Sequence, residues 1–122
     1  KNKKYPEWTK GTPSFNKSHH QLSFIEEEDI IEEIVKCISF DDLIEKYSIK
    51  KIDLLQIDTE GYDAEIIKMI DFDKLCPTII SFEHGLPQGI MTLKQFEECQ
   101  EILLKNKYNI IVLENDAIAY KG

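Results

Sequence analysis

Four polar side chains suited to acid–base chemistry stand directly after two apolar runs of this chain. Asp58 and Glu60 follow the run Ile52–Ile57, and Glu83 and His84 end the next apolar run. If both runs form neighbouring parallel strands, their carboxyl ends meet at one rim of the sheet, where open α/β folds bind ligands. Acids and an imidazole held together there could take a proton from a hydroxyl group, orient it, or hold a divalent metal.

The same residues also have a purely structural interpretation. Asp58 and Glu60 can satisfy backbone N–H groups where the following helix begins, and Gly61 can supply the turn between strand and helix. Spacing alone does not separate the two interpretations. The presence of acids at the ends of two strands favours the functional one.

The elements that must position these residues follow from the apolar pattern. Lys51–Ile70 indicates a buried strand, a polar turn and a helix, the unit from which α/β sheets are built. The pattern predicts strands at 52–58, 78–84, 108–113 and 117–120, and helices at 64–70 and 93–106. Only a hairpin fits the short connection between the last two strands, so that pair must be antiparallel.

The stretch before this unit carries two competing periodicities. Residues 24–35 have apolar residues at helical spacing, whereas residues 34–40 alternate like a strand. We predict a strand over Ile34–Phe40, and either a helical turn or another strand before it. A short helix should follow, with Asp41 or Asp42 as its cap. Its inward-facing residues should be Leu43, Ile44 and Tyr47.

The predicted order is therefore β-α-β-α-β-α-β-β, an α/β domain whose mostly parallel sheet ends in an antiparallel hairpin. At 122 residues the chain is expected to form one domain. Residues 1–22 contain Pro6, Gly11 and Pro13 without a sustained apolar period and are predicted to be mostly loop.

The composition is that of a soluble globular protein, with 42% hydrophobic and 31% charged residues. The net charge is −8, and all 15 basic residues are lysines. Without a basic face or guanidinium groups the chain is poorly suited to nucleic acid or to an anionic membrane surface. No apolar run approaches the length of about 20 residues that a membrane span needs.

Histidine and cysteine give no metal signature. His19 and His20 are neighbours that point in different directions, and no acid or third histidine follows at helical spacing, so we interpret them as exposed or packing residues. Cys37, Cys76 and Cys99 are odd in number and widely spaced, which fits neither a disulfide framework nor a metal cluster. We expect reduced, core-type thiols in a cytoplasmic protein, with no bound metal.

One stretch carries a family resemblance. Ile52–Gly61, IDLLQIDTEG, resembles the hallmark I-D-L-L-K-I-D-x-E-G-x-E of the FkbM family of S-adenosylmethionine-dependent methyltransferases. Gln56 replaces the usual lysine and Asp63 the usual glutamate, while Phe82-Glu83 is similar to the end of a later strand in that family. Two upstream stretches also resemble the family, Cys37–Leu43 and Gly11–His20.

The resemblance implies a Rossmann-like methyltransferase fold and methyl transfer to a hydroxyl group on a small molecule, often a sugar or secondary metabolite. The protein's part would be to align the acceptor oxygen and remove its proton. The resemblance assigns catalytic roles to Asp58, Glu60 and His84, cofactor contacts to Asp58 and Thr59, and acceptor contacts to Glu60, Gly61, Glu83 and His84.

The chain also departs from the family pattern. It lacks the glycine-rich turn that cradles the cofactor and the acidic residue of the next strand that would bind the ribose. In the family these features precede the part that the chain resembles. We therefore expect residues 1–122 to be the C-terminal part of a methyltransferase domain and to be inactive alone.

Two alternatives stay open. The first is a non-catalytic interaction or assembly module derived from a methyltransferase, which would homodimerise through an exposed sheet edge or face. The second and less favoured is a metal-dependent exonuclease, because Asp58-Thr59-Glu60 resembles its D-x-E motif. A helix rather than a hairpin strand is predicted after this motif, and the further acidic ligands are not convincingly placed.

Overall fold

A computed structural model describes residues 5–11, 13–19, 21 and 24–122. In chain order its helices and strands are α1 (Phe40–Lys46), β1 (Leu54–Ile57), α2 (Asp63–Met69), β2 (Ile79–Glu83), α3 (Leu93–Lys105), β3 (Asn109–Val112) and β4 (Asp116–Tyr120). Short 3₁₀ turns are η1 (Glu7–Gly11), η3 (Glu27–Asp29) and η4 (Leu86–Gln88). None of the helices in the described ranges is both long and apolar enough to cross a bilayer.

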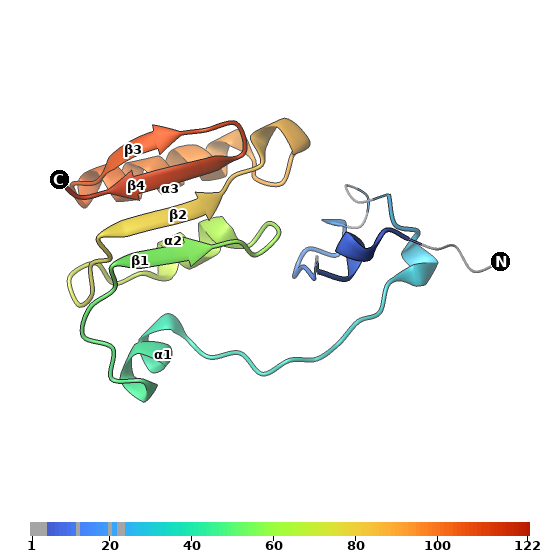
Figure 1. The fold of residues 1–122 in the computed structure, drawn as a ribbon, viewed down its shortest axis with the longest axis horizontal. Helices are drawn as coiled ribbons and strands as arrows, with labels where there is room; N and C mark the ends of the chain where they lie inside the picture. Colours follow the sequence, from blue (N-terminus) through green and yellow to red (C-terminus); the bar gives the residue numbers. More distant parts are fainter. Residues whose placement is uncertain (1–4, 12, 20, 22–23) are drawn as a thin grey trace.

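The four strands form one mixed sheet in the order β1-β2-β4-β3 (Figure 1). β1 and β2 are parallel, and β4 runs antiparallel to both β2 and β3. The predicted α/β class and the final hairpin are thus confirmed. The predicted mostly parallel pairing is corrected, because β4 returns between β2 and β3 and leaves one parallel pair.

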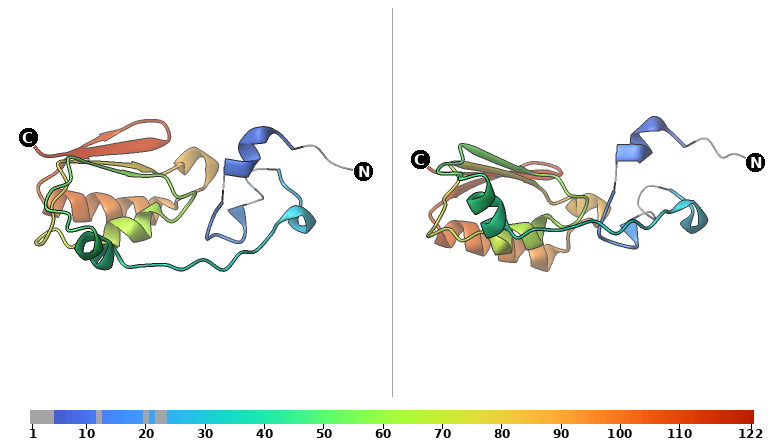
Figure 2. Two further views of the ribbon diagram at one scale, coloured as in Figure 1. Left: turned by 60° about the horizontal axis from the view of Figure 1, so that its bottom comes forward. Right: turned by 90° about the horizontal axis from the view of Figure 1, so that it is seen from below.

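Helices α2 and α3 lie on one face of this sheet (Figure 2). The core lies between them and includes Ile80, Phe82 and Ala119, all fully buried. Since side chains alternate across a strand, the neighbouring positions face the other way. There Leu54 is 56% exposed and Ile111 48% exposed, and none of the described elements covers that face.

Helix α3 shows how local sequence fixes an element. Thr92 accepts a hydrogen bond from the backbone N–H of Gln95, whose side chain accepts one from the backbone N–H of Thr92, a capping box. The residues that the helix buries are Phe96, Cys99 and Leu103. Leu104 lies one residue, about 100° of helical rotation, beyond Leu103 and is 59% exposed.

The predicted strand over Ile34–Phe40 is wrong. Residues 31–39 form no regular element, and the side chain of Ile34 is completely exposed. The alternating pattern produces extended backbone, but a strand also needs a neighbour to pair with, and no described strand lies beside this segment (Figure 1). Cys37 is exposed here rather than in the core, whereas Cys99 is buried as expected.

The predicted helix after this segment exists as α1, with two corrections. Its N-cap is Ser39, whose hydroxyl accepts from the backbone N–H of Asp42 at 3.0 Å, so neither predicted aspartate is the cap. Tyr47 is the C-cap and is 62% exposed rather than facing inward. Leu43 and Ile44 are partly buried, as predicted for the inward face of this short helix.

The one-sided packing predicts a large difference between the two faces of the sheet. Ile80→Ala should lower the free energy of unfolding by about 2–5 kcal/mol, because it empties a fully buried position in β2. Leu54→Ala should lower it by no more than about 1 kcal/mol, since that side chain is already half in water. Urea denaturation measures both, and equal losses would mean that the bare face is covered in solution.

Candidate active site at the carboxyl ends of β1 and β2

The carboxylate of Asp63 joins the ends of the two parallel strands. It is completely buried and accepts hydrogen bonds from the backbone N–H and the hydroxyl of Thr59, at 3.1 and 2.6 Å, and from the backbone N–H of Glu83, at 3.0 Å. Thr59 follows β1, and Glu83 ends β2. Because hydrogen bonds to an ionised carboxylate are among the stronger ones in proteins, this contact fixes the relative position of both strand ends.

The turn after β1 has left-handed backbone. Glu60 has φ of 53° and Gly61 φ of 103°. Glycine adopts such values freely, but glutamate does so at a cost of about 1 kcal/mol or more. The Ser14 hydroxyl donates to the backbone carbonyl oxygen of Glu60 at 2.6 Å and so helps to hold this conformation. Gly61 thus supplies the predicted turn.

A loop from the N-terminal segment covers this turn. Nε2 of His19 lies 3.1 Å from a carboxylate oxygen of Glu60, and His19 is 6% exposed. The ring of Phe15 packs against that of Tyr62 with centroids 5.3 Å apart. Since the carboxylate accepts, Nε2 carries the proton in the neutral ring, which leaves the lone pair on Nδ1. Nδ1 is buried and has no hydrogen-bond partner among the described residues.

His19 is the site residue that sequence reasoning missed. It was expected to be exposed or to pack, and the structure gives it a charged partner 41 positions away in the chain. The only signal was that the loop Gly11–His20 resembles an upstream loop of the family. His20 lies outside the described residues.

The carboxyl group of Glu83 has a strongly raised pKa. Burial, and after it the negative charges of Glu60 and Asp58, together raise the pKa of its carboxyl to about 7. One of its carboxylate oxygens is buried with no hydrogen-bond partner in the part of the chain that the structure describes. Glu83 therefore exchanges a proton near neutrality and can both donate and accept. Asp58 lies at the end of β1 with its side chain exposed.

The structure does not bring His84 to these acids. Its ring is 2% exposed, packs on Phe96 at 4.7 Å between centroids, and uses both nitrogens on the backbone. Nδ1 accepts from the N–H of Leu86 at 3.2 Å, so Nε2 donates to the carbonyl oxygen of Leu113 at 3.3 Å. Because side chains alternate along β2, His84 faces the helices and Glu83 faces away from them.

The rim thus gathers Asp58, Glu60, Glu83 and His19, with Asp63 beneath them. The negative charges of Glu60 and Asp58 help to raise the pKa of Glu83, and such a group of acids suits a ligand that carries positive charge or a hydroxyl. Within the described ranges no group of three or more histidine, cysteine, aspartate or glutamate side chains is arranged to hold a metal ion.

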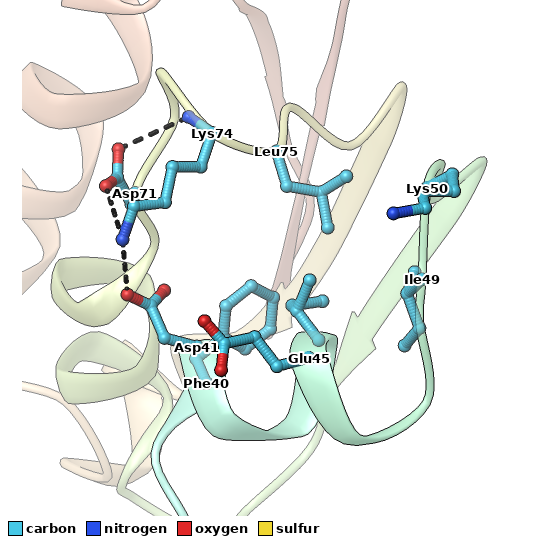
Figure 3. Close-up of a pocket in the computed structure, with 9 residues that line it drawn as sticks. Phe40, Asp41, Glu45, Ile49, Lys50, Asp71, Lys74 and Leu75 are labelled. Carbon is cyan, nitrogen blue, oxygen red and sulfur yellow. Dashed lines mark hydrogen bonds and ion pairs between the residues drawn. The ribbon is translucent and has the colours of Figure 1, made fainter.

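A cavity lies elsewhere in the domain (Figure 3). It has a volume of about 220 Å³ between α1 and the loop after α2. Its walls include Phe40, Ile44 and Leu75. Across its rim Nζ of Lys74 contacts Asp41 at 2.7 Å and Asp71 at 3.4 Å. Since Lys50 and Leu75 precede β1 and β2, this cavity is at the amino ends of the strands, opposite the acids.

A family model of the methyltransferase FkbM domain matches residues 2–110. The chain belongs to the FkbM methyltransferase family. The match confirms the resemblance drawn from IDLLQIDTEG, and every acid of the rim lies within the matched range of this FkbM domain. Searches of curated proteins and of solved structures returned no match.

The Asp63 contact predicts a specific stability loss in this FkbM domain. Asp63→Asn keeps the shape of the side chain but puts an NH₂ group against N–H donors, so it should lower the free energy of unfolding by about 1–3 kcal/mol. The matched control is Asp73→Asn, an exposed aspartate that should change stability by less than about 0.5 kcal/mol. Chemical denaturation of both variants measures the difference.

The raised pKa of Glu83 predicts how stability depends on pH. The folded chain holds the Glu83 proton up to about pH 7, whereas the unfolded chain loses it near the ordinary value of 4.5. Stability should therefore fall as pH rises from about 4.5 to 7 and level off above that. The loss should be on the order of 1 kcal/mol, because partial solvent exposure screens the charges.

Glu83→Gln mimics the protonated carboxyl, so this component of the pH dependence should disappear in the variant. Unfolding free energies at pH 5 and pH 8 for both proteins provide the comparison. An unchanged difference between the two pH values would contradict the assignment.

Proposed function

We propose that this FkbM domain takes part in S-adenosylmethionine-dependent methylation of a hydroxyl group, on a sugar or another small metabolite, and that its sheet is the acceptor side of a Rossmann-like fold. The observation that carries the proposal is the buried His19–Glu60 pair, with an unpartnered imidazole nitrogen, beside an acid whose pKa is about 7. These groups stand where α/β folds bind ligands, at the carboxyl ends of parallel strands.

The charged end of S-adenosylmethionine fits the acids of the rim. Its sulfonium and α-ammonium groups are positive, and the pKa of Glu83 is raised by burial and then by the negative charges of Glu60 and Asp58. We propose that Asp58 and Thr59 contact that end. The described residues include no glycine-rich turn for the adenosine end, which supports the expectation that the chain alone does not turn over.

When bound, S-adenosylmethionine supplies an electrophilic methyl group. The acceptor oxygen must lose its proton as it takes that group, and we propose Nδ1 of His19 as the atom that receives the proton. Glu60 then stabilises the imidazolium through Nε2, 3.1 Å away. Glu83 orients the acceptor, since its carboxyl can donate to an oxygen or accept from a hydroxyl near neutral pH. His84, whose nitrogens are occupied, has no part in this scheme.

The charge argument can be tested by using Glu83 as a reporter. In NMR titrations of the carboxyl, saturating S-adenosylmethionine should lower the Glu83 pKa from about 7, because its sulfonium charge favours the carboxylate. S-adenosylhomocysteine lacks that charge and is the matched control, so it should lower the pKa less. The Asp58→Asn variant should bind S-adenosylmethionine more weakly than the wild-type chain does.

Equal pKa changes with both ligands would contradict the placement of the donor beside Glu83. If neither ligand changes any resonance, the chain does not contact the donor. That outcome would favour the second candidate, a non-catalytic interaction module. The observation that supports this candidate is the bare face of the sheet, on which Leu54 and Ile111 are exposed.

A further inference from the structure

Residues 31–38, here called the bridging segment, expose an unusual amount of apolar surface. Ile31 is 90% exposed and Ile34 completely exposed, while Val35 and Ile38 are just over half exposed. The segment runs between η3 and α1 as extended chain away from the sheet (Figures 1 and 2). Its β-branched residues favour strand geometry, yet residues 31–38 make no backbone–backbone hydrogen bond within the described chain. The carbonyl oxygen of Val35 accepts from Sγ of Cys37 at 3.9 Å.

The bridging segment is anchored at both ends. On its carboxyl side Ser39 caps α1, and Lys74 binds Asp41 of that helix. On its amino side the loop before it is held to the strand ends by the His19–Glu60 pair. A strand that is already extended and tethered loses little conformational freedom when it pairs. Such an unpaired backbone is a template for a strand from another chain.

We propose that two copies of this chain associate by antiparallel pairing of their bridging segments about a two-fold axis. In the symmetric register each residue i faces residue 69 − i of the other copy. The facing pairs are Ile31 with Ile38, Glu32 with Cys37, Glu33 with Lys36, and Ile34 with Val35. Each pair occurs twice because the axis makes the contact self-complementary.

The facing residues in this register favour a second copy of the chain as the partner that pairs with the bridging segment. Apolar residues face apolar residues, and Glu33 faces the opposite charge of Lys36, which are the cross-strand pairs that stabilise antiparallel strands. Each face of the ribbon then carries Ile31 and Val35 from one copy and Ile34 and Ile38 from the other. The exposed edge of β1, LLQI, offers no charge to match Glu33 or Lys36. This interface is independent of the proposed methyl transfer.

A two-stranded ribbon is only marginally stable in water, so the association should be weak and reversible. In sedimentation equilibrium under reducing conditions, the weight-average mass of the wild-type chain should rise from 14.3 kDa toward twice that value as its concentration increases. The reductant excludes disulfides through the exposed Cys37. A mass that stays at 14.3 kDa at every concentration would overturn the proposal.

Charge reversal tests the register itself. Glu33→Lys places two lysines opposite each other in both facing pairs, and Lys36→Glu places two glutamates there, so each variant alone should stay monomeric. Mixed together, they restore an opposite-charge pair at both positions and should form a heterodimer. Both side chains are exposed, so neither substitution threatens the fold.

The matched control is Glu28→Lys, which makes the same charge change on an exposed residue outside the bridging segment and should self-associate like the wild type. Self-association of either single variant, or a mixture that stays monomeric, would exclude this register. If Leu54→Lys on β1 abolished the dimer while Glu33→Lys did not, the interface would be the sheet edge or bare face, and the bridging segment would be excluded.

Discussion

The site depends on one buried charge. The carboxylate of Asp63 stands at the start of α2 and receives three hydrogen bonds, two from Thr59 and one from Glu83. An ionised carboxylate is stable in a protein interior only when such donors replace water. Because the donors belong to the ends of two different strands, their spacing is set by one side chain. The turn that carries Glu60 is held between this anchor and β1.

Electrostatics then gives the rim its chemical character. Three acids lie close together at the strand ends, and the field of Glu60 and Asp58 adds to burial in raising the pKa of Glu83 to about 7. The His19 ring lies against one of these acids, with Nε2 3.1 Å from a carboxylate oxygen of Glu60. The result is a site in which one acid, Glu83, exchanges its proton near neutral pH, as acids that take part in proton transfer do. Membership of the FkbM methyltransferase family agrees with this character.

The fold leaves two surfaces without partners among the described residues. One is the sheet face opposite α2 and α3, and the other is the bridging segment, residues 31–38. Both expose branched aliphatic side chains, and contiguous patches of that kind mark interaction surfaces in soluble proteins. The strand ends, in contrast, are covered by the loop that carries Ser14 and His19. The proposed chemistry and the proposed self-association therefore use separate parts of the chain.

The sequence by itself determined the local features of this protein. Apolar period and turn chemistry located β1, α2, β2, α3 and the β3–β4 hairpin within about two residues, because those signals are local. The motif IDLLQIDTEG was enough to identify the family. The predicted strand order also placed Asp58, Glu60 and Glu83 at one rim of the sheet, because the carboxyl ends of adjacent parallel strands meet there.

Tertiary structure decided what depends on distant partners. Residues 34–40 alternate like a strand but remain unpaired, because pairing needs a neighbour that local sequence cannot supply. His84 turns into the core since Phe96 and two backbone groups meet it there, whereas His19 gains Glu60 from 41 positions away. Periodicity tells which way a side chain can point, and only the packed fold decides what it meets.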